Sequence, residues 1–125
     1  MIGTSCRAVV KPPFNFVLEI DDLKCEDVWE RVLMSLKENK IPILVLDKEK
    51  EYIKTGPIVT APLQGEPYQK MEEKYLINVK CIEPLVTQIT CQVQLRGMTK
   101  DNKWIEVKET EKYERRFTNS LRFNK

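Results

Sequence analysis

Apolar and polar residues alternate along three stretches of the chain, and a period of two is typical of β-strands with one buried face. These stretches, which we expect to be strands, are 14–20, 74–82 and 88–97. Pro84 lies in the short segment between the second and third of them, which predicts a hairpin. Shorter apolar runs predict further strands at 41–47, 52–54, 57–62 and 103–108.

Two other segments repeat their apolar residues every three or four positions, which is the spacing of an amphipathic helix. The first spans 24–39 and carries the stripe Cys25, Val28, Trp29, Val32 and Leu36. Pro42 prevents this helix from continuing. The second begins near Glu109 and spaces Tyr113, Phe117 and Leu121 four residues apart, which leaves basic residues such as Arg116 on its solvated face.

This order of elements predicts an α+β fold of the arrangement β-α-β4/5-α. We expect an antiparallel β-sheet of about five to six strands packed on one long helix, with a short C-terminal helix: a helix-grip. A length of 125 residues fits one domain. We expect a flexible lead-in over 1–13, ending at Pro12-Pro13, and a single α+β domain over 14–125.

Composition excludes several classes of function. The 21 basic and 19 acidic residues give a net charge of +2, which argues against a dedicated nucleic-acid binder. Apolar runs fall short of the roughly 20 residues of a membrane span. The chain contains no histidine, which excludes Ser-His-Asp and Cys-His catalysis within it. We therefore expect no enzyme activity and no cofactor.

The four cysteines are Cys6, Cys25, Cys81 and Cys91, and no pair has the short spacing of zinc ligands. We expect buried or free thiols and no metal site, with a disulfide framework as the open alternative. A bridge between Cys81 and Cys91, which share the core face of neighbouring strands, would be strained. Cys6 follows small residues, as at the end of a bacterial lipoprotein signal, so it is a candidate lipidation site. A chance cysteine in a disordered tail is the alternative.

A second group of residues is expected to contact partners. Trp104 lies on the opposite face of its strand from Ile105, and an exposed tryptophan is a frequent interface anchor. Leu44 and Leu46 fall on the nominally outer face of the strand 41–47, as Val17 does in the first strand. If they meet in space, they form an apolar patch.

Several of these positions resemble the helix-grip domain of BamC-type lipoproteins, accessory members of the bacterial outer-membrane protein assembly machinery. The resemblance covers 14–107 and depends on a tryptophan in the helix, an Ile followed by Asp, and Gly-x-Ile-x-Thr. The matching positions are Trp29, Val32, Leu36, Ile43, Asp47, Gly56, Ile58 and Thr60. The interval between Asp47 and Gly56 is long for this pattern, and one such domain is present where BamC carries two. The resemblance implies an envelope location, a lipid anchor and a scaffolding role, and it implies no catalytic residues.

We therefore expect a non-enzymatic cell-envelope binding or scaffold module, accessory to outer-membrane protein assembly and held in the periplasm or at the outer membrane by its lipid. A chain with no upstream signal would be cytoplasmic. The expected partners are other envelope proteins, not nucleic acid. The alternative function is a small-molecule or lipid carrier with a cavity between helix and sheet. That cavity would be lined by Phe16, Leu18, Trp29, Tyr75, Val79 and Val93.

Overall fold

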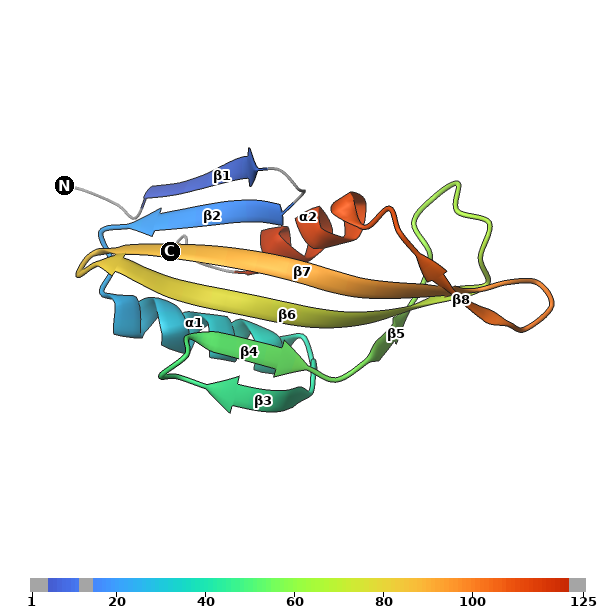
Figure 1. Cartoon of the computed structure of the whole chain (residues 1–125), viewed down its shortest axis with the longest axis horizontal. Coiled ribbons are helices and arrows are strands. Elements are labelled where there is room, and N and C mark those ends of the chain that lie inside the picture. Colours follow the sequence, from blue (N-terminus) through green and yellow to red (C-terminus); the bar gives the residue numbers. More distant parts are fainter. Residues whose placement is uncertain (1–4, 12–14, 122–125) are drawn as a thin grey trace.

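An antiparallel sheet covered on one face by two helices forms the fold (Figure 1). The computed structural model describes residues 5–11 and 15–121, with side chains from residue 17 onward. The elements are β1 (Ser5–Lys11), β2 (Asn15–Asp21), α1 (Cys25–Glu38), β3 (Ile43–Asp47), β4 (Tyr52–Thr55), β5 (Ile58–Thr60), β6 (Lys70–Glu83), β7 (Val86–Met98), β8 (Trp104–Val107) and α2 (Glu111–Ser120).

The strands follow the order β1-β2-β7-β6-β4-β3, with β5 also paired to β6 and β8 to β7. Every pairing is antiparallel. The long β6–β7 hairpin forms the centre of the sheet, and Tyr75 lies opposite Val93 within it. Strand β3 therefore ends the sheet on one side, and β1 ends it on the other.

The predicted α+β class and antiparallel sheet are confirmed, but the finer description is only roughly matched. Within the described residues, the sheet has eight strands instead of five or six. Residues 5–11, expected to belong to a flexible lead-in, form β1 and pair with β2. Pro12-Pro13 lie outside the described residues.

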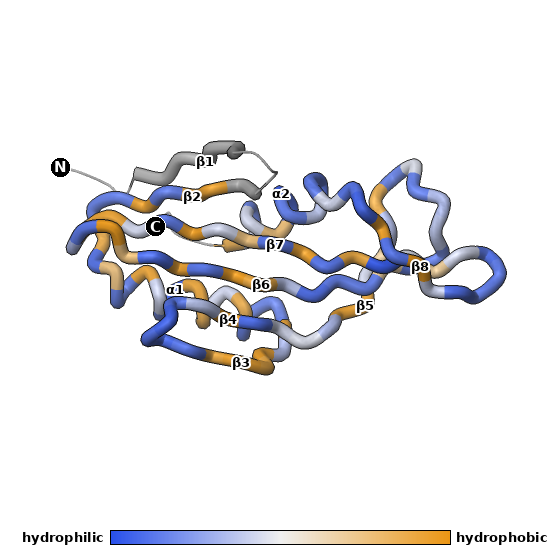
Figure 2. Tube along the Cα trace, viewed as in Figure 1, coloured by the Kyte–Doolittle hydropathy of each residue, from blue (hydrophilic) through white to orange (hydrophobic). Residues whose placement is uncertain are grey.

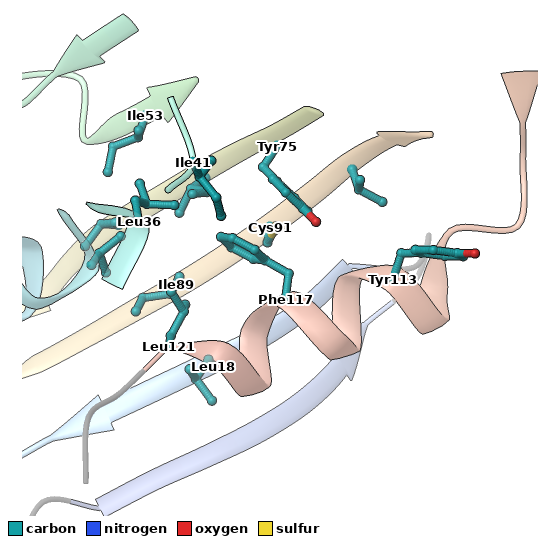
Figure 3. Close-up of a cluster of buried hydrophobic side chains, with 14 of the residues drawn as sticks. Leu18, Leu36, Ile41, Ile53, Tyr75, Ile89, Cys91, Tyr113, Phe117 and Leu121 are labelled. Atoms are coloured by element: carbon teal, nitrogen blue, oxygen red, sulfur yellow. The ribbon is translucent and has the colours of Figure 1, made fainter. Parts of the chain in front are cut away.

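Both helices pack their apolar stripes into one continuous core (Figure 3). Trp29 is 5% exposed, so its indole is buried as the helical stripe predicts. From α2, Tyr113, Phe117 and Leu121 are buried as well, and the Phe117 ring stacks on Tyr75 with centroids 4.1 Å apart. The core thus lies between the helices and one face of β2, β7, β6 and β4.

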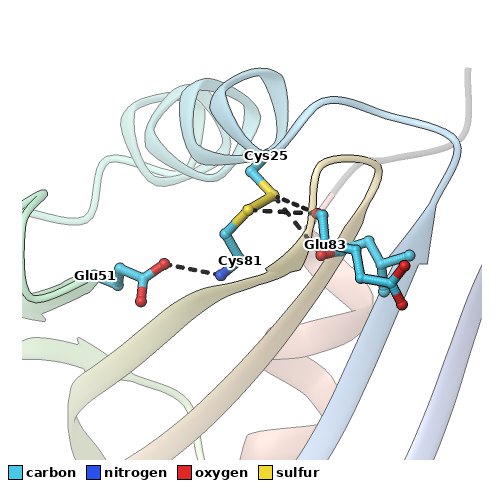
Figure 4. The surroundings of a disulfide bond; sticks show 5 residues. Cys25, Glu51, Cys81 and Glu83 are labelled. Atoms are coloured by element: carbon cyan, nitrogen blue, oxygen red, sulfur yellow. Dashed lines mark hydrogen bonds between the residues drawn. A yellow bond between two sulfur atoms is a disulfide. The ribbon is translucent and has the colours of Figure 1, made fainter.

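A disulfide joins Cys25 at the start of α1 to Cys81 near the end of β6 (Figure 4). The expectation of free or buried thiols is therefore wrong for these two residues. Their Cα atoms lie 5.6 Å apart, because the first turn of α1 crosses the end of the β6–β7 hairpin. Cys91 is a free, buried thiol, and the side chain of Cys6 lies outside the described residues.

Candidate functional site

Strand β3 carries a run of exposed aliphatic side chains at an edge of the sheet. Ile43 is 39% exposed, Leu44 64%, Val45 37% and Leu46 51%. Figure 2 shows this apolar strand at the border of the sheet, next to the charged β3–β4 turn. Four consecutive exposed aliphatic residues are unusual for a strand, in which one face is normally buried. We call these four residues the β3 patch.

The register of β3 against β4 explains why both faces of the strand are exposed. Leu46 lies opposite the buried Ile53, and Val45 lies opposite Lys54 on the other face of the sheet. A register shift between Ile43 and Val45 inserts an extra residue into β3. Leu46 therefore lies on the helix-covered face, where we had expected it on the outer face. It remains exposed because no other strand of residues 5–11 or 15–121 lies beside β3 on that side.

The backbone of β3 also presents polar groups at this edge. The N–H of Val79 donates to the Glu51 carbonyl at 2.8 Å, so this carbonyl faces β6. In the same register of β4 against β6, the backbone groups of Ile53 face β6 as well. Residues 52 and 54 then face β3 and pair with 47 and 45. The N–H and C=O of Leu46, between those two positions, point away from β4 toward the open edge.

One side of α1 lies beside the β3–β4 turn. Glu26 Oε1 is 3.5 Å from Nζ of Lys48, which follows β3 directly. Leu33 comes two helical turns after Glu26 and so lies on the same side of α1. It is half-buried and packs against the core. The side of α1 that faces the β3–β4 turn thus carries a charged residue, Glu26, and a half-buried apolar one, Leu33.

Trp104 and Val17 do not join the β3 patch. Trp104 is half-buried on β8, with the guanidinium carbon of Arg96 5.3 Å from its ring centroid. Strand β8 pairs with β7, whereas β3 pairs with β4. Val17 is buried on β2, which β7, β6 and β4 separate from β3. The leucines of β3 therefore form a surface of their own.

Five of the six residues expected to line a carrier cavity lie in the packed core. Leu18, Trp29, Tyr75, Val79 and Val93 are all buried and belong to one hydrophobic cluster. The side chain of Phe16 lies outside the described residues.

Three hollows on the described surface open to solvent. A hollow of about 470 Å³ on the sheet is lined by residues that include Tyr52, Lys54, Lys74, Asn78 and Gln92. One of about 290 Å³ lies beside the disulfide, and one of about 900 Å³ lies at the start of α2 among mostly charged side chains. None of these hollows combines an enclosed apolar wall with converging polar groups, as ligand pockets usually do.

A buried polar cluster beneath α2 was not foreseen from the sequence. Glu73 is fully buried on β6 and accepts hydrogen bonds from Thr60 Oγ1 and Tyr75 Oη. Arg116 Nη2 lies 2.6 Å from Glu73 Oε2, although we had assigned Arg116 to the solvated face of its helix. The Arg116 guanidinium also lies 5.0 Å from the Tyr113 ring centroid. This cluster ties α2 to the sheet, because the buried Glu73 carboxylate on β6 accepts hydrogen bonds from Thr60, Tyr75 and, on α2, Arg116.

Two further groups under α2 are ionisable and buried. Burial raises the pKa of the Cys91 thiol well above its ordinary value, and the nearby Glu114 and Glu73 carboxylates raise it further. Burial also raises the pKa of Glu114, although the Val93 N–H donates to its carboxylate and opposes the shift. The Cys91 thiol therefore stays protonated and out of contact with solvent, which rules it out as a nucleophile in this conformation.

Over residues 5–11 and 15–121, no group of three or more Cys, Asp or Glu side chains is arranged to hold a metal ion. Over the same part of the chain, neither helix has the length and apolar character needed to cross a bilayer.

No protein family and no curated protein matches the sequence. One similar solved structure is that of a DUF4468 family protein from Bacteroides ovatus ATCC 8483, with 17% sequence identity and a TM-score of 0.48. The match covers 83% of this chain and 64% of that chain, so this chain spans less than two thirds of its length. Similarity at this level transfers no function.

Proposed function

We propose that this chain is a non-enzymatic binding or scaffold module of the cell envelope that contacts a protein partner through the β3 patch. The observation that carries the proposal is the run of four exposed aliphatic residues at an open sheet edge. Soluble proteins rarely leave such a strand uncovered, because it invites contact with another chain. The helix-grip arrangement and the resemblance to BamC-type lipoproteins support the same reading.

The Cys25–Cys81 disulfide supports an envelope location. Disulfides persist in the periplasm and other oxidising compartments and are rare in the cytosol. An anchor through lipidated Cys6 at the outer membrane fits this location, and the envelope assembly components are the partners that the resemblance suggests. Such a module needs no nucleic acid and no cofactor.

The binding module is favoured over the lipid or small-molecule carrier and over an enzyme. Five of the six side chains that would line a carrier cavity, all except Phe16, are buried in one packed cluster. The sequence has no histidine to act as a general base at neutral pH.

Site-specific photo-crosslinking in the host cell tests the function. A benzophenone amino acid at Leu44 is expected to give one discrete adduct with an envelope protein. The same group at Gln92, exposed on the polar face of the sheet, is the control and should give none. Equal adducts from both positions, or none from Leu44, would refute the β3 patch as the contact surface.

Thiol blocking tests the compartment. Protein taken from the host and alkylated before reduction should leave Cys25 and Cys81 unmodified. Alkylation of both residues would place the protein in a reducing compartment and refute the envelope location.

A further inference from the structure

We propose that the partner contributes an extended segment that adds to the sheet as a ninth strand along β3. This inference rests on the proposed function and specifies how the β3 patch binds. The occupant is a single β-strand of another protein, with apolar residues at alternate positions.

The backbone of β3 favours a strand over any other occupant. The Leu46 N–H and C=O point to the open edge, so they can pair with a partner backbone in the plane of the sheet. A helix satisfies its own backbone groups and would leave these two unmatched by protein. An added strand instead supplies main-chain affinity and places its side chains on both faces of the sheet.

The size of the β3 patch separates a segment from a second copy of this chain. The exposed fractions of its four residues correspond to roughly 300 Å² of apolar surface, the lower end for functional patches. Two copies meeting through β3 would bury roughly 600 Å² of this surface, about half of what the smallest stable protein interfaces need. The register shift between Ile43 and Val45 limits a regular ladder with any added strand to the last three residues of β3, which suits a short segment.

The two faces of the sheet define the chemistry of the segment. On the helix-covered face, its side chains would lie beside Leu46, which is 51% exposed, and this favours large aliphatic or aromatic residues. On the other face, they would lie beside Val45 and the carboxylate of Asp47. Lysine, arginine or threonine is favoured there, because a cation complements Asp47 across the strand pair.

The test uses a ten-residue synthetic peptide that alternates valine with lysine and threonine. Titration into the intact protein is followed by fluorescence anisotropy of the labelled peptide and by amide hydrogen exchange. In the free protein, the Leu46 amide should exchange quickly, and the amides of Val45 and Asp47, which face β4, slowly. Saturating peptide should slow exchange at Leu46.

Two variants at one position separate backbone pairing from side-chain contact. Leu46→Ser keeps the N–H and removes the aliphatic side chain, and we expect about fivefold weaker binding. Leu46→Pro also removes the edge N–H without touching the ladder to β4, and we expect a further threefold to tenfold loss. Val59→Ser, at a residue 61% exposed on β5, is the control and should bind as the wild type does.

The outcomes distinguish the strand mode from the proposed function. If the peptide binds and Leu46→Ser weakens it, but Leu46 exchange does not slow, the β3 patch binds through side chains alone. Strand addition is then refuted and the proposed function stands. If the peptide fails to bind, strand addition also falls, whereas the proposed function is decided by the crosslink from Leu44. If Leu46→Pro fails to fold, amide hydrogen exchange at Leu46 of the wild-type protein, with and without peptide, still tests strand addition.

Discussion

Removal of the Cys25–Cys81 disulfide should lower the free energy of unfolding of this fold substantially. The double variant Cys25→Ser/Cys81→Ser opens a cross-link between residues 56 positions apart. In the chain-entropy description, closing a loop of that length in the unfolded state stabilises the native state by about 4 kcal/mol. The free energy of unfolding of the variant should therefore be lower by about 4 kcal/mol.

The replacement isolates the cross-link from neighbouring contacts. The backbone N–H of Cys81 donates to Glu51 Oε2 at 2.8 Å, and a serine keeps this bond (Figure 4). Cys81 is exposed, so the smaller side chain creates little buried void. The lost stability is therefore expected to come from the cross-link and not from packing.

Urea denaturation followed by tryptophan fluorescence measures the change, because Trp29 on α1 is buried in the core. With a typical urea dependence of about 2 kcal/mol per molar, the unfolding midpoint should fall by roughly 2 M. Wild-type protein in a strong reductant should behave as the double variant does. A difference of less than about 1 kcal/mol between oxidised protein and variant would refute the entropic reasoning or the bridge itself.

Three further predictions concern the packing and electrostatics of the core. Burial raises the pKa of Glu114, so the stability linked to this group is present below its unfolded pKa and lost as pH rises through its folded pKa. Glu114→Gln should therefore raise the Tm at pH 8 and change it little near pH 4. Arg116→Met should cost about 3 kcal/mol in denaturant, because it leaves Glu73 buried without its cation, and Glu73→Gln should recover part of that loss. Gly97→Ala should lower the Tm, because its Cβ would lie 2.6 Å from Tyr68 Cγ, and Tyr68→Ala in the same chain should restore it.

The strongest periodic patterns in the sequence predicted the elements correctly. The stripe of α1 and the alternation in β6 and β7 each reflect burial of one face, and this requirement is local in sequence. The four-residue spacing of Tyr113, Phe117 and Leu121 predicted α2 for the same reason. Strand β1 was missed because it follows no comparable alternation.

The features that depend on tertiary placement were not predictable. Four cysteines allow three pairings of two bridges, and nothing in the spacing indicates that α1 begins over the end of β6. Arg116 meets Glu73 across 43 residues, and helical periodicity alone placed it in solvent. The face of Leu46 was assigned wrongly because a single extra residue in β3 changes every later position.

The β3 patch contributes little to the fold that carries it, and this contrast is the physical basis for assigning it to binding. Buried residues such as Ile53 on the neighbouring strand account for the packing against α1 and the rest of the core. Leu44 is 64% exposed, so a polar side chain there would remove little buried apolar area and would shield the edge from other chains. Pro42 and the bulge already restrict which strands can pair with β3, since they limit the regular ladder to its final residues. The β3 edge is restricted in register but keeps its aliphatic side chains. Such an edge suits selective pairing with one short segment, whereas an edge protected against pairing with any strand would carry charged or polar residues.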